Sequence, residues 1–171
     1  IDVHLIKYWT KKTKSSFESK FFKKSFYYSY DLKAQKSIEI KTISSISSLI
    51  ICDNYNFIID SLKNDFLDIN NNNYNISSLD RGNKLFDSIN YWRGPMWVNL
   101  TWLIINGLEK LNKNDLAKKI KNCCIKKIDS VGFYEYFDSN DINDNKLSGC
   151  GDNKFSWTAA IFICMIRNIK F

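Results

Sequence analysis

The sequence contains few of the residues that usually bind metals or break helices. Its 171 residues include one histidine, His4, and one proline, Pro95. His4 has no partner motif, so we interpret it as a surface or packing residue rather than a ligand. The cysteines lack the spacing of a metal site. We therefore expect no metal and no cofactor.

The five cysteines also lack the pattern of a disulfide framework. Their number is odd, and Cys123 and Cys124 are neighbours on a predicted helix, too constrained to bond to each other in an ordinary disulfide. We interpret these cysteines as small, buried apolar residues of a protein in a reducing compartment. We therefore expect a cytoplasmic protein. The cysteines are Cys52, Cys123, Cys124, Cys150 and Cys164.

Long apolar runs, a signal peptide and arginine clusters are also lacking. No segment is apolar enough over sufficient length to span a bilayer, so no membrane partner is expected. The formal net charge of +7 suggests nucleic acid at first sight. However, the charge is spread as lysine among many asparagines and isoleucines, a mixture that indicates nucleotide-composition bias. We therefore expect no nucleic-acid partner.

Enough apolar residues are present for the core of one ordinary domain, or of a piece of one. They make up 44% of the chain, and 15% of residues are aromatic. The chain begins Ile1-Asp2-Val3 in mid-pattern without a methionine, which predicts a truncated N-terminus. Apolar spacing predicts about six helices and two short strands joined by a lysine-rich turn. The predicted helices are Val3–Phe22, Ser44–Cys52, Tyr55–Phe66, Trp97–Leu111, Leu116–Val131 and Phe155–Ile169, and the strands are Phe26–Asp31 and Ser37–Ile40. Of the two short helices, we predict that Ser44 or Ser45 caps the first and Asp53 or Asn54 the second.

The stretch Tyr91–Trp97 contains the only proline, two of the five tryptophans and an arginine. Because a proline lacks the N–H that would be unpaired in a first helical turn, Gly94-Pro95 predicts the entrance to a helix. The residues before it would lie on the loop that leads into this helix. Core packing of both tryptophans, with Arg93 as a surface charge, is the alternative.

Glu135 is the strongest candidate for a catalytic group. It lies within the aromatic segment Gly132–Asp138, where a solvated carboxylate has no obvious role. A general base needs an ionisation that its surroundings control. The alternative is an exposed glutamate on a strand edge. Aromatic faces with a carboxylate and an arginine suit a sugar, and a pocket for a flat heteroaromatic ligand would have the same composition.

Three motifs in order give the sequence a resemblance to a known family. Tyr91-Trp-Arg-Gly-Pro-Met-Trp97, Gly132-Phe-Tyr-Glu-Tyr-Phe-Asp138 and Phe155-Ser-Trp-Thr-Ala-Ala160 resemble the C-terminal part of glycoside hydrolase family 63. The likeness is greatest to its mannosylglycerate hydrolase-like bacterial branch and extends over nearly the whole chain. It implies an all-α fold in which residues 1–171 form a single partial domain. This domain would be the C-terminal half of an (α/α)6 barrel with a small β-hairpin insertion.

The resemblance also implies an enzyme, an inverting glycoside hydrolase acting on α-linked glucosides or mannosides. Glu135 matches the family's general base, whereas the family's general acid, an aspartate beside tryptophan, has no match here. The acid is therefore expected in the N-terminal half of the same barrel, which would be this chain's partner besides an oligosaccharide or glycoside substrate. A non-catalytic carbohydrate-binding or scaffold α-toroid fragment is the alternative. The residues expected to contact substrate are Tyr91, Trp92, Arg93, Trp97, Tyr134, Tyr136 and Trp157.

Carboxylates near the motifs in sequence are expected to have another role. We predict that Asp80, Asp138 and Asp152 form turns or caps rather than face Glu135 across a pocket.

Overall fold

A computed structural model describes residues 2–52, 55–143 and 148–169 of the chain. Within these residues, six α-helices contain most of the regular structure, and the strands form three short antiparallel pairs. This confirms the predicted all-α class. The two residues proposed to cap the second predicted short helix, Asp53 and Asn54, lie outside the described residues.

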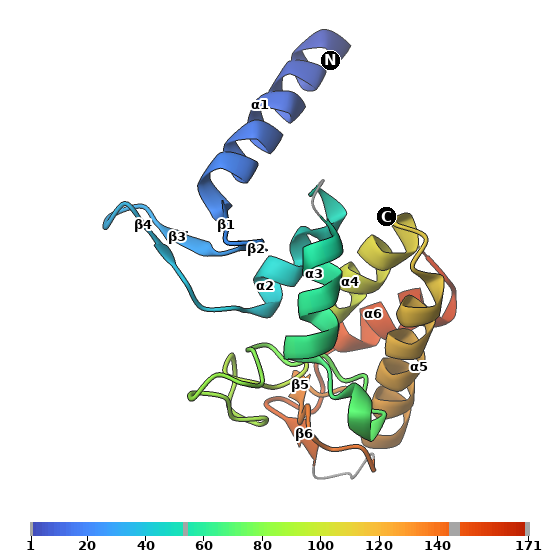
Figure 1. The fold of residues 1–171 in the computed structure, drawn as a ribbon. Helices are drawn as coiled ribbons and strands as arrows, with labels where there is room; N and C mark the ends of the chain where they lie inside the picture. Colours follow the sequence, from blue (N-terminus) through green and yellow to red (C-terminus); the bar gives the residue numbers. More distant parts are fainter. Residues whose placement is uncertain (1, 53–54, 144–147, 170–171) are drawn as a thin grey trace.

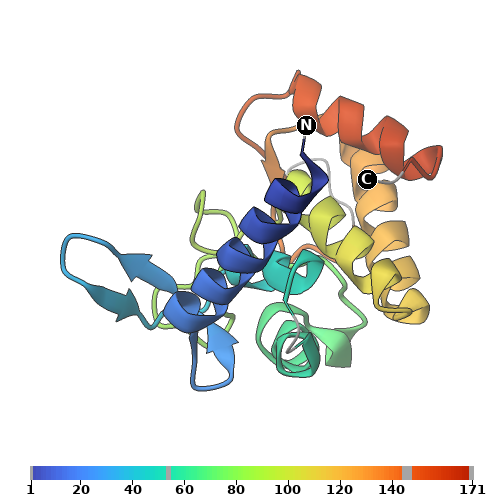
Figure 2. The same ribbon diagram turned by 90° about the horizontal axis from the view of Figure 1, so that it is seen from above.

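The chain opens with a long helix that stands apart from the rest of the molecule (Figure 1). Helix α1 spans Val3–Phe21, begins with the Asp2 carboxylate accepting the His4 N–H, and buries none of its residues. Two hairpins follow. Strand β1 (Phe22–Lys23) pairs with β2 (Phe26–Tyr27), and β3 (Ser29–Asp31) pairs with β4 (Lys36–Ile38). Figure 2 shows the β3–β4 hairpin projecting away from the later helices.

The β3–β4 hairpin confirms the predicted pair of strands in part. Its register places Ser29 opposite Ile38, but Phe26 and Tyr27 belong to the first hairpin instead. The turn of that hairpin is Lys24-Ser25, and both residues have positive φ. Such a turn matches the twist of paired strands. Because Lys24-Ser25 contains neither glycine nor asparagine, the first hairpin has no turn signal in the sequence.

The middle of the chain is built from short helical turns and a long irregular segment. Helix α2 (Ile43–Ile46) continues as the 3-10 helix η1 (Ser47–Ile50). Helix α3 (Tyr55–Ser61) continues as the π-helical turn η2 (Leu62–Phe66), and a 3-10 turn, η3, covers Ile69–Asn71. Residues 76–97 then contain no helix or strand. The N-cap of α2 is Thr42 rather than the predicted Ser44 or Ser45. The backbone of Thr42 forms a bridge with Leu79, and the helix begins directly after it.

The core lies around helix α4 (Val98–Lys110). This helix packs against η1, against α5 (Asn114–Val131) and against α6 (Ser156–Ile166). Gly107 allows the close approach of α4 to η1, because a Cβ there would lie 2.9 Å from the Leu49 Cβ. Ile104 and Leu108 on α4 are completely buried. Burial of such side chains contributes roughly 1.5–3 kcal/mol each.

Helix α4 begins later than the sequence predicts. Pro95 does not occupy its first turn, because the helix starts at Val98 with Trp97 as the N-cap. The backbone of Met96 instead pairs with Phe137, through bonds of 2.8 and 3.0 Å in the two directions. That pairing needs extended backbone, so the helix cannot begin until the chain has passed Met96. The last helix is also shorter than predicted and ends at Ile166 rather than Ile169.

The segment before α4 and the connection between α5 and α6 lie at the same end of the molecule (Figure 1). Strand β5 (Tyr136–Phe137) pairs with β6 (Gly149–Cys150) below the helices, beside the irregular segment that leads into α4. All three sequence motifs are therefore found at this end. Among the described residues, no helix is both long and apolar enough to cross a bilayer.

Candidate active site

The loop before Gly94 is closed on itself by backbone hydrogen bonds. The Asp87 N–H donates to the Arg93 carbonyl at 2.8 Å, and the Arg93 N–H donates to the Asn90 carbonyl at 2.8 Å. Gly94 lies directly against the Asp87 carbonyl, which a Cβ at this position would overlap. Its N–H donates to the Ser78 hydroxyl at 2.9 Å. Glycine is therefore required here to hold the tip of the loop against the irregular segment.

Four aromatic rings from two of the motifs form one stack. Trp92 lies parallel to Trp97 with centroids 3.9 Å apart, and Trp97 stacks on Tyr136 at 5.0 Å. Tyr91 contacts all three rings edge-on, and its carbonyl accepts the Trp97 indole N–H at 3.0 Å. Both faces of Trp97 are thus covered, and only 4% of it is exposed. Trp92 and Tyr91 remain 42% and 49% exposed and form the outer surface of the stack.

Strand β5 joins this stack to the third motif. Met96 pairs with Phe137 on one side of β5, while Tyr136 lies opposite Cys150 on the other. The carbonyls of Phe133 and Tyr134 accept hydrogen bonds from the N-terminal end of α6. The Phe155 N–H reaches the first and the Thr158 hydroxyl the second, each at 2.8 Å. Backbone pairing therefore brings the three motifs together.

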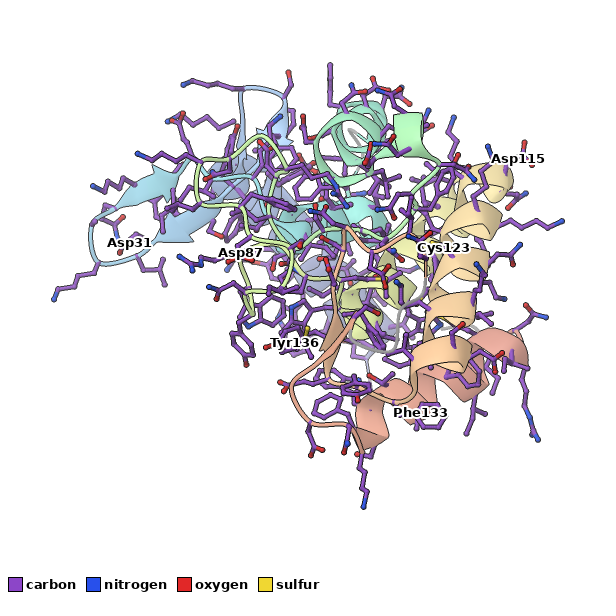
Figure 3. All side chains as sticks on the ribbon, turned by 90° about the horizontal axis from the view of Figure 1, so that it is seen from below. Asp31, Asp87, Asp115, Cys123, Phe133 and Tyr136 are labelled. Atoms are coloured by element: carbon purple, nitrogen blue, oxygen red, sulfur yellow. The ribbon has the colours of Figure 1, made fainter. Side chains whose placement is uncertain are left out.

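Glu135 is half-buried beside the aromatic stack. Its N–H donates to the Asp152 carbonyl at 2.9 Å, and its side chain lies against Gly151. Burial raises the pKa of the Tyr136 phenol, and the neighbouring Cys150, Glu135 and Tyr91 raise it further. Burial and the Asp138 carboxylate likewise raise the pKa of the Cys150 thiol. Both groups therefore stay protonated near neutral pH. Figure 3 labels Tyr136, at β5.

The remaining predicted contact residues lie around this group rather than in it. Arg93 is exposed, and within the described parts of the chain its guanidinium forms no ion pair. Trp157 is 54% exposed, and its neighbouring ring is Phe155, with centroids 6.4 Å apart. Tyr134 packs edge-on against buried Phe137. The structure thus assembles Tyr91, Trp92, Trp97 and Tyr136 next to Glu135, with Arg93, Tyr134 and Trp157 outside the stack.

The nearby aspartates form turns, as predicted. The carboxylates of Asp80, Asp138 and Asp152 each accept the backbone N–H two residues further on, at 2.7, 2.8 and 3.0 Å. Hydrogen bonds of this kind fix the chain direction in Asx-turns.

A second arginine, Arg81, holds the loop that follows β5, a role that sequence reasoning missed. It donates to Asn140 Oδ1 at 2.6 Å and to the carbonyls of Ser139, Asn75 and Phe66 at 3.0–3.2 Å. Burial lowers the pKa of the guanidinium, and Asp68 and Asp138 partly oppose this. Three of the four acceptors are backbone carbonyls, which every residue has, so no side-chain motif could identify them.

Helix α5 holds the same loop from the other side. The Lys127 ammonium is completely buried and donates to the Asp141 carbonyl at 2.6 Å and its carboxylate at 3.1 Å. The Asn73 and Asn75 amides donate to the carbonyls of Ser139 and Asp141. The burial of Lys127 could have been predicted from the sequence. Lys127 lies three residues after Cys124 and seven after Ile120, which places it on the buried face of the helix.

No cluster of three or more histidine, cysteine or acidic side chains suited to a metal ion occurs within residues 2–52, 55–143 and 148–169. The side chains at this end of the molecule include the carboxylate of Glu135, the phenols of Tyr91 and Tyr136 and the aromatic faces of the stack.

Comparison with known proteins identifies the class of protein that this fold and this group of residues define. The structure matches the crystal structure of a GH63 mannosylglycerate hydrolase from Thermus thermophilus in complex with glucose, with a TM-score of 0.81 and 25% identity. The match covers 95% of this chain and 41% of that one. The same enzyme in complex with Tris and D-glycerate gives a TM-score of 0.80. The fold is therefore that of family 63 glycoside hydrolases.

Sequence comparison narrows the class to one family. Residues 2–158 match the mannosylglycerate hydrolase MGH1-like glycoside hydrolase domain, and the chain belongs to this family. It is 36% identical over 91 residues to the mannosylglycerate hydrolase of Rubrobacter radiotolerans, covering 53% of this chain and 20% of that protein. It is 28% identical over 143 residues to a mannosylglycerate hydrolase of Thermus thermophilus, covering 83% and 33%. The chain thus spans a third or less of these relatives.

Proposed function

We propose that this chain supplies the general-base side of the active site of an inverting glycoside hydrolase. The pairing of Met96 with Phe137 supports this most directly, because it joins the exposed aromatic stack to the segment that carries Glu135. Aromatic faces can bind a sugar ring, and a carboxylate beside them can activate a water molecule that attacks the anomeric carbon. Family membership favours this chemistry over other ligands for such a surface.

In the proposed reaction Glu135 accepts a proton from a water molecule as that water attacks the anomeric carbon. A carboxylic acid on the opposite side protonates the leaving oxygen, with the two carboxyl groups roughly 6.5–9.5 Å apart to leave room for the water. Asp80, Asp138 and Asp152 are poor candidates for that acid because each is engaged in a turn. We therefore propose that the acid belongs to the complementary, N-terminal part of the barrel.

The sugar would rest on the outer surface of the aromatic stack. Trp92 and Tyr91 are exposed there, while Trp97 and Tyr136 hold them in position. Arg93 and Trp157, both exposed, would contact parts of the substrate further from Glu135, and Tyr134 would support β5 from behind. The relatives are named mannosylglycerate hydrolases, which supports an α-mannoside or α-glucoside of a small acid as substrate.

Helix α1 offers a surface for the complementary part of the barrel. Ile6, Trp9 and Phe17 line a groove of about 570 Å³ together with Ile50 and Ile51. An exposed apolar groove of this kind favours contact with another apolar helix face.

All five cysteines are free thiols, which supports a reducing, cytoplasmic location.

The test is Glu135→Gln in the full-length catalytic protein that contains these residues, assayed with mannosylglycerate. Loss of the base should lower kcat by about 10²–10⁴-fold while the circular dichroism spectrum and Tm stay unchanged. Asp115→Asn, on the first turn of α5 and far from Tyr136, which follows Glu135 (Figure 3), is the matched control and should leave kcat unaltered. Near-normal turnover of Glu135→Gln would reject the assignment. If the protein without substitutions binds the sugar but does not hydrolyse it, the result would support a binding module instead.

A further inference from the structure

The segment opposite Glu135 departs from regular pairing at one residue, Gly151. Tyr136 lies opposite Cys150, but the next hydrogen bond runs from the Glu135 N–H to the Asp152 carbonyl. Gly151 is therefore an extra residue in its strand, as in a β-bulge. Its φ of +72° lies in the left-handed region that favours glycine.

The space that a side chain would occupy at Gly151 is filled by Glu135. An ideal Cβ on Gly151 would lie 2.5 Å from Glu135 Oε2 and 2.8 Å from the Glu135 Cβ. It would also lie 3.1 Å from Cε1 of Tyr136. The Glu135 side chain thus lies over the bare Cα of Gly151, beside the Tyr136 ring.

We infer that Gly151 is a positioning residue for Glu135, and that its lack of a side chain sets the direction of the carboxylate. This inference rests on the proposed role of Glu135 as general base. The left-handed conformation alone would make glycine the favoured residue at a bulge, wherever the bulge lay. The contact with Glu135 adds a second requirement, because any Cβ must push the carboxylate out of its present place.

Such a displacement should act on the chemical step. A base removes a proton efficiently only when its oxygen lies within hydrogen-bond reach of the attacking water. A misplacement of about 1 Å can lower a rate by about 10²-fold. The closest contacts of a Gly151 Cβ are with Glu135, and its 3.1 Å approach to the Tyr136 ring requires only a small shift of that ring. Substrate binding on the exposed rings of Trp92 and Tyr91 should therefore change far less than kcat.

The experiment compares Gly151→Ala with Gly132→Ala in the full-length catalytic protein, using mannosylglycerate. Gly132 also has positive φ, at +112°, so alanine strains the backbone at both positions. A Cβ at Gly132, however, meets only the Tyr134 ring, at an ordinary 3.8 Å. The ψ of −172° makes the backbone of Gly132 the more restrictive for alanine, so we expect at least as large a Tm loss for Gly132→Ala as for Gly151→Ala. We nevertheless expect kcat to be about 10²-fold lower for Gly151→Ala alone, with KM little changed. Gly151→Asn adds a Cβ with less backbone strain, because asparagine tolerates positive φ, and covers the case in which Gly151→Ala does not fold.

A double variant separates positioning from general damage. If Gly151 acts through Glu135, Glu135→Gln with Gly151→Ala should be no slower than Glu135→Gln alone. Multiplying effects, or equal kcat for Gly151→Ala and Gly132→Ala, would overturn the inference while leaving the role of Glu135 intact. An unchanged kcat for Glu135→Gln would instead reject the proposed function itself.

Discussion

At the scale of single residues, the two arginines near the site have opposite environments. Arg93 is exposed on the loop that precedes Gly94, while Arg81 donates hydrogen bonds to four acceptors in three separate segments. A guanidinium suits this task because its five N–H donors point in fixed directions within one plane. Arg81 therefore determines where the loop after β5 lies, while Arg93 is accessible to a ligand.

Substituting Arg81 with lysine should measure this role. The Arg81→Lys variant keeps the charge but cannot reach all four acceptors, so we expect the free energy of unfolding to fall by about 1.5–3 kcal/mol. Urea denaturation monitored by tryptophan fluorescence gives the value. Arg167→Lys, at an exposed position after α6, is the control and should change little. Equal stability of the two variants would show that the hydrogen bonds of Arg81 do not stabilise the loop.

At the scale of elements, α1 differs from the other helices in its burial. It spans 19 residues and buries none of them, although Ile6 and Trp9 are apolar and are 43% and 54% exposed. Its apolar spacing is visible in the sequence, but the spacing cannot say what covers the helix. Helices α1, α4 and α5 all lie close to their predicted bounds, but only α4 and α5 have apolar stripes that meet each other within the chain.

Exposed apolar residues on α1 should make the isolated 171-residue chain associate with itself. Trp9→Glu should weaken that association about ten- to hundredfold, because a large apolar side chain contributes roughly 1.5–3 kcal/mol when buried. Lys11→Gln on the same helix changes the charge by the same single unit and is the control. Sedimentation velocity over a range of concentrations measures the effect. A monomeric chain that unfolds cooperatively at high concentration would contradict a functional interface on α1.

The limits of sequence-based prediction are clearest where backbone pairing controls an element. Pro95 and Trp97 predict a helix at almost the right place, but the bond between Met96 and Phe137 delays its start. The aromatic residues are recognisable as a group, whereas the burial of Trp97 between two rings depends on a partner distant in sequence. Gly151 carries no signal at all, because its importance lies in what occupies the space beside it.

At the scale of the whole molecule, a single end of the fold carries the residues that the family resemblance singles out. Backbone pairing joins the loop before α4, strand β5 and the start of α6 there, and the aspartates nearby are used in turns. The chain spans 41% of the solved relative in complex with glucose. We therefore propose one carboxylate here, with the other supplied by the complementary part of the barrel.

The anomeric form of the first product tests the central claim most directly. Proton NMR follows the hydrolysis of an α-linked mannosylglycerate by the full-length protein, in the minutes before mutarotation equilibrates the sugar. If Glu135 activates water on the face opposite the leaving group, β-mannose accumulates first, and this signal disappears in Glu135→Gln. Initial release of α-mannose would mean that configuration is retained and that Glu135 is not the base of an inverting pair.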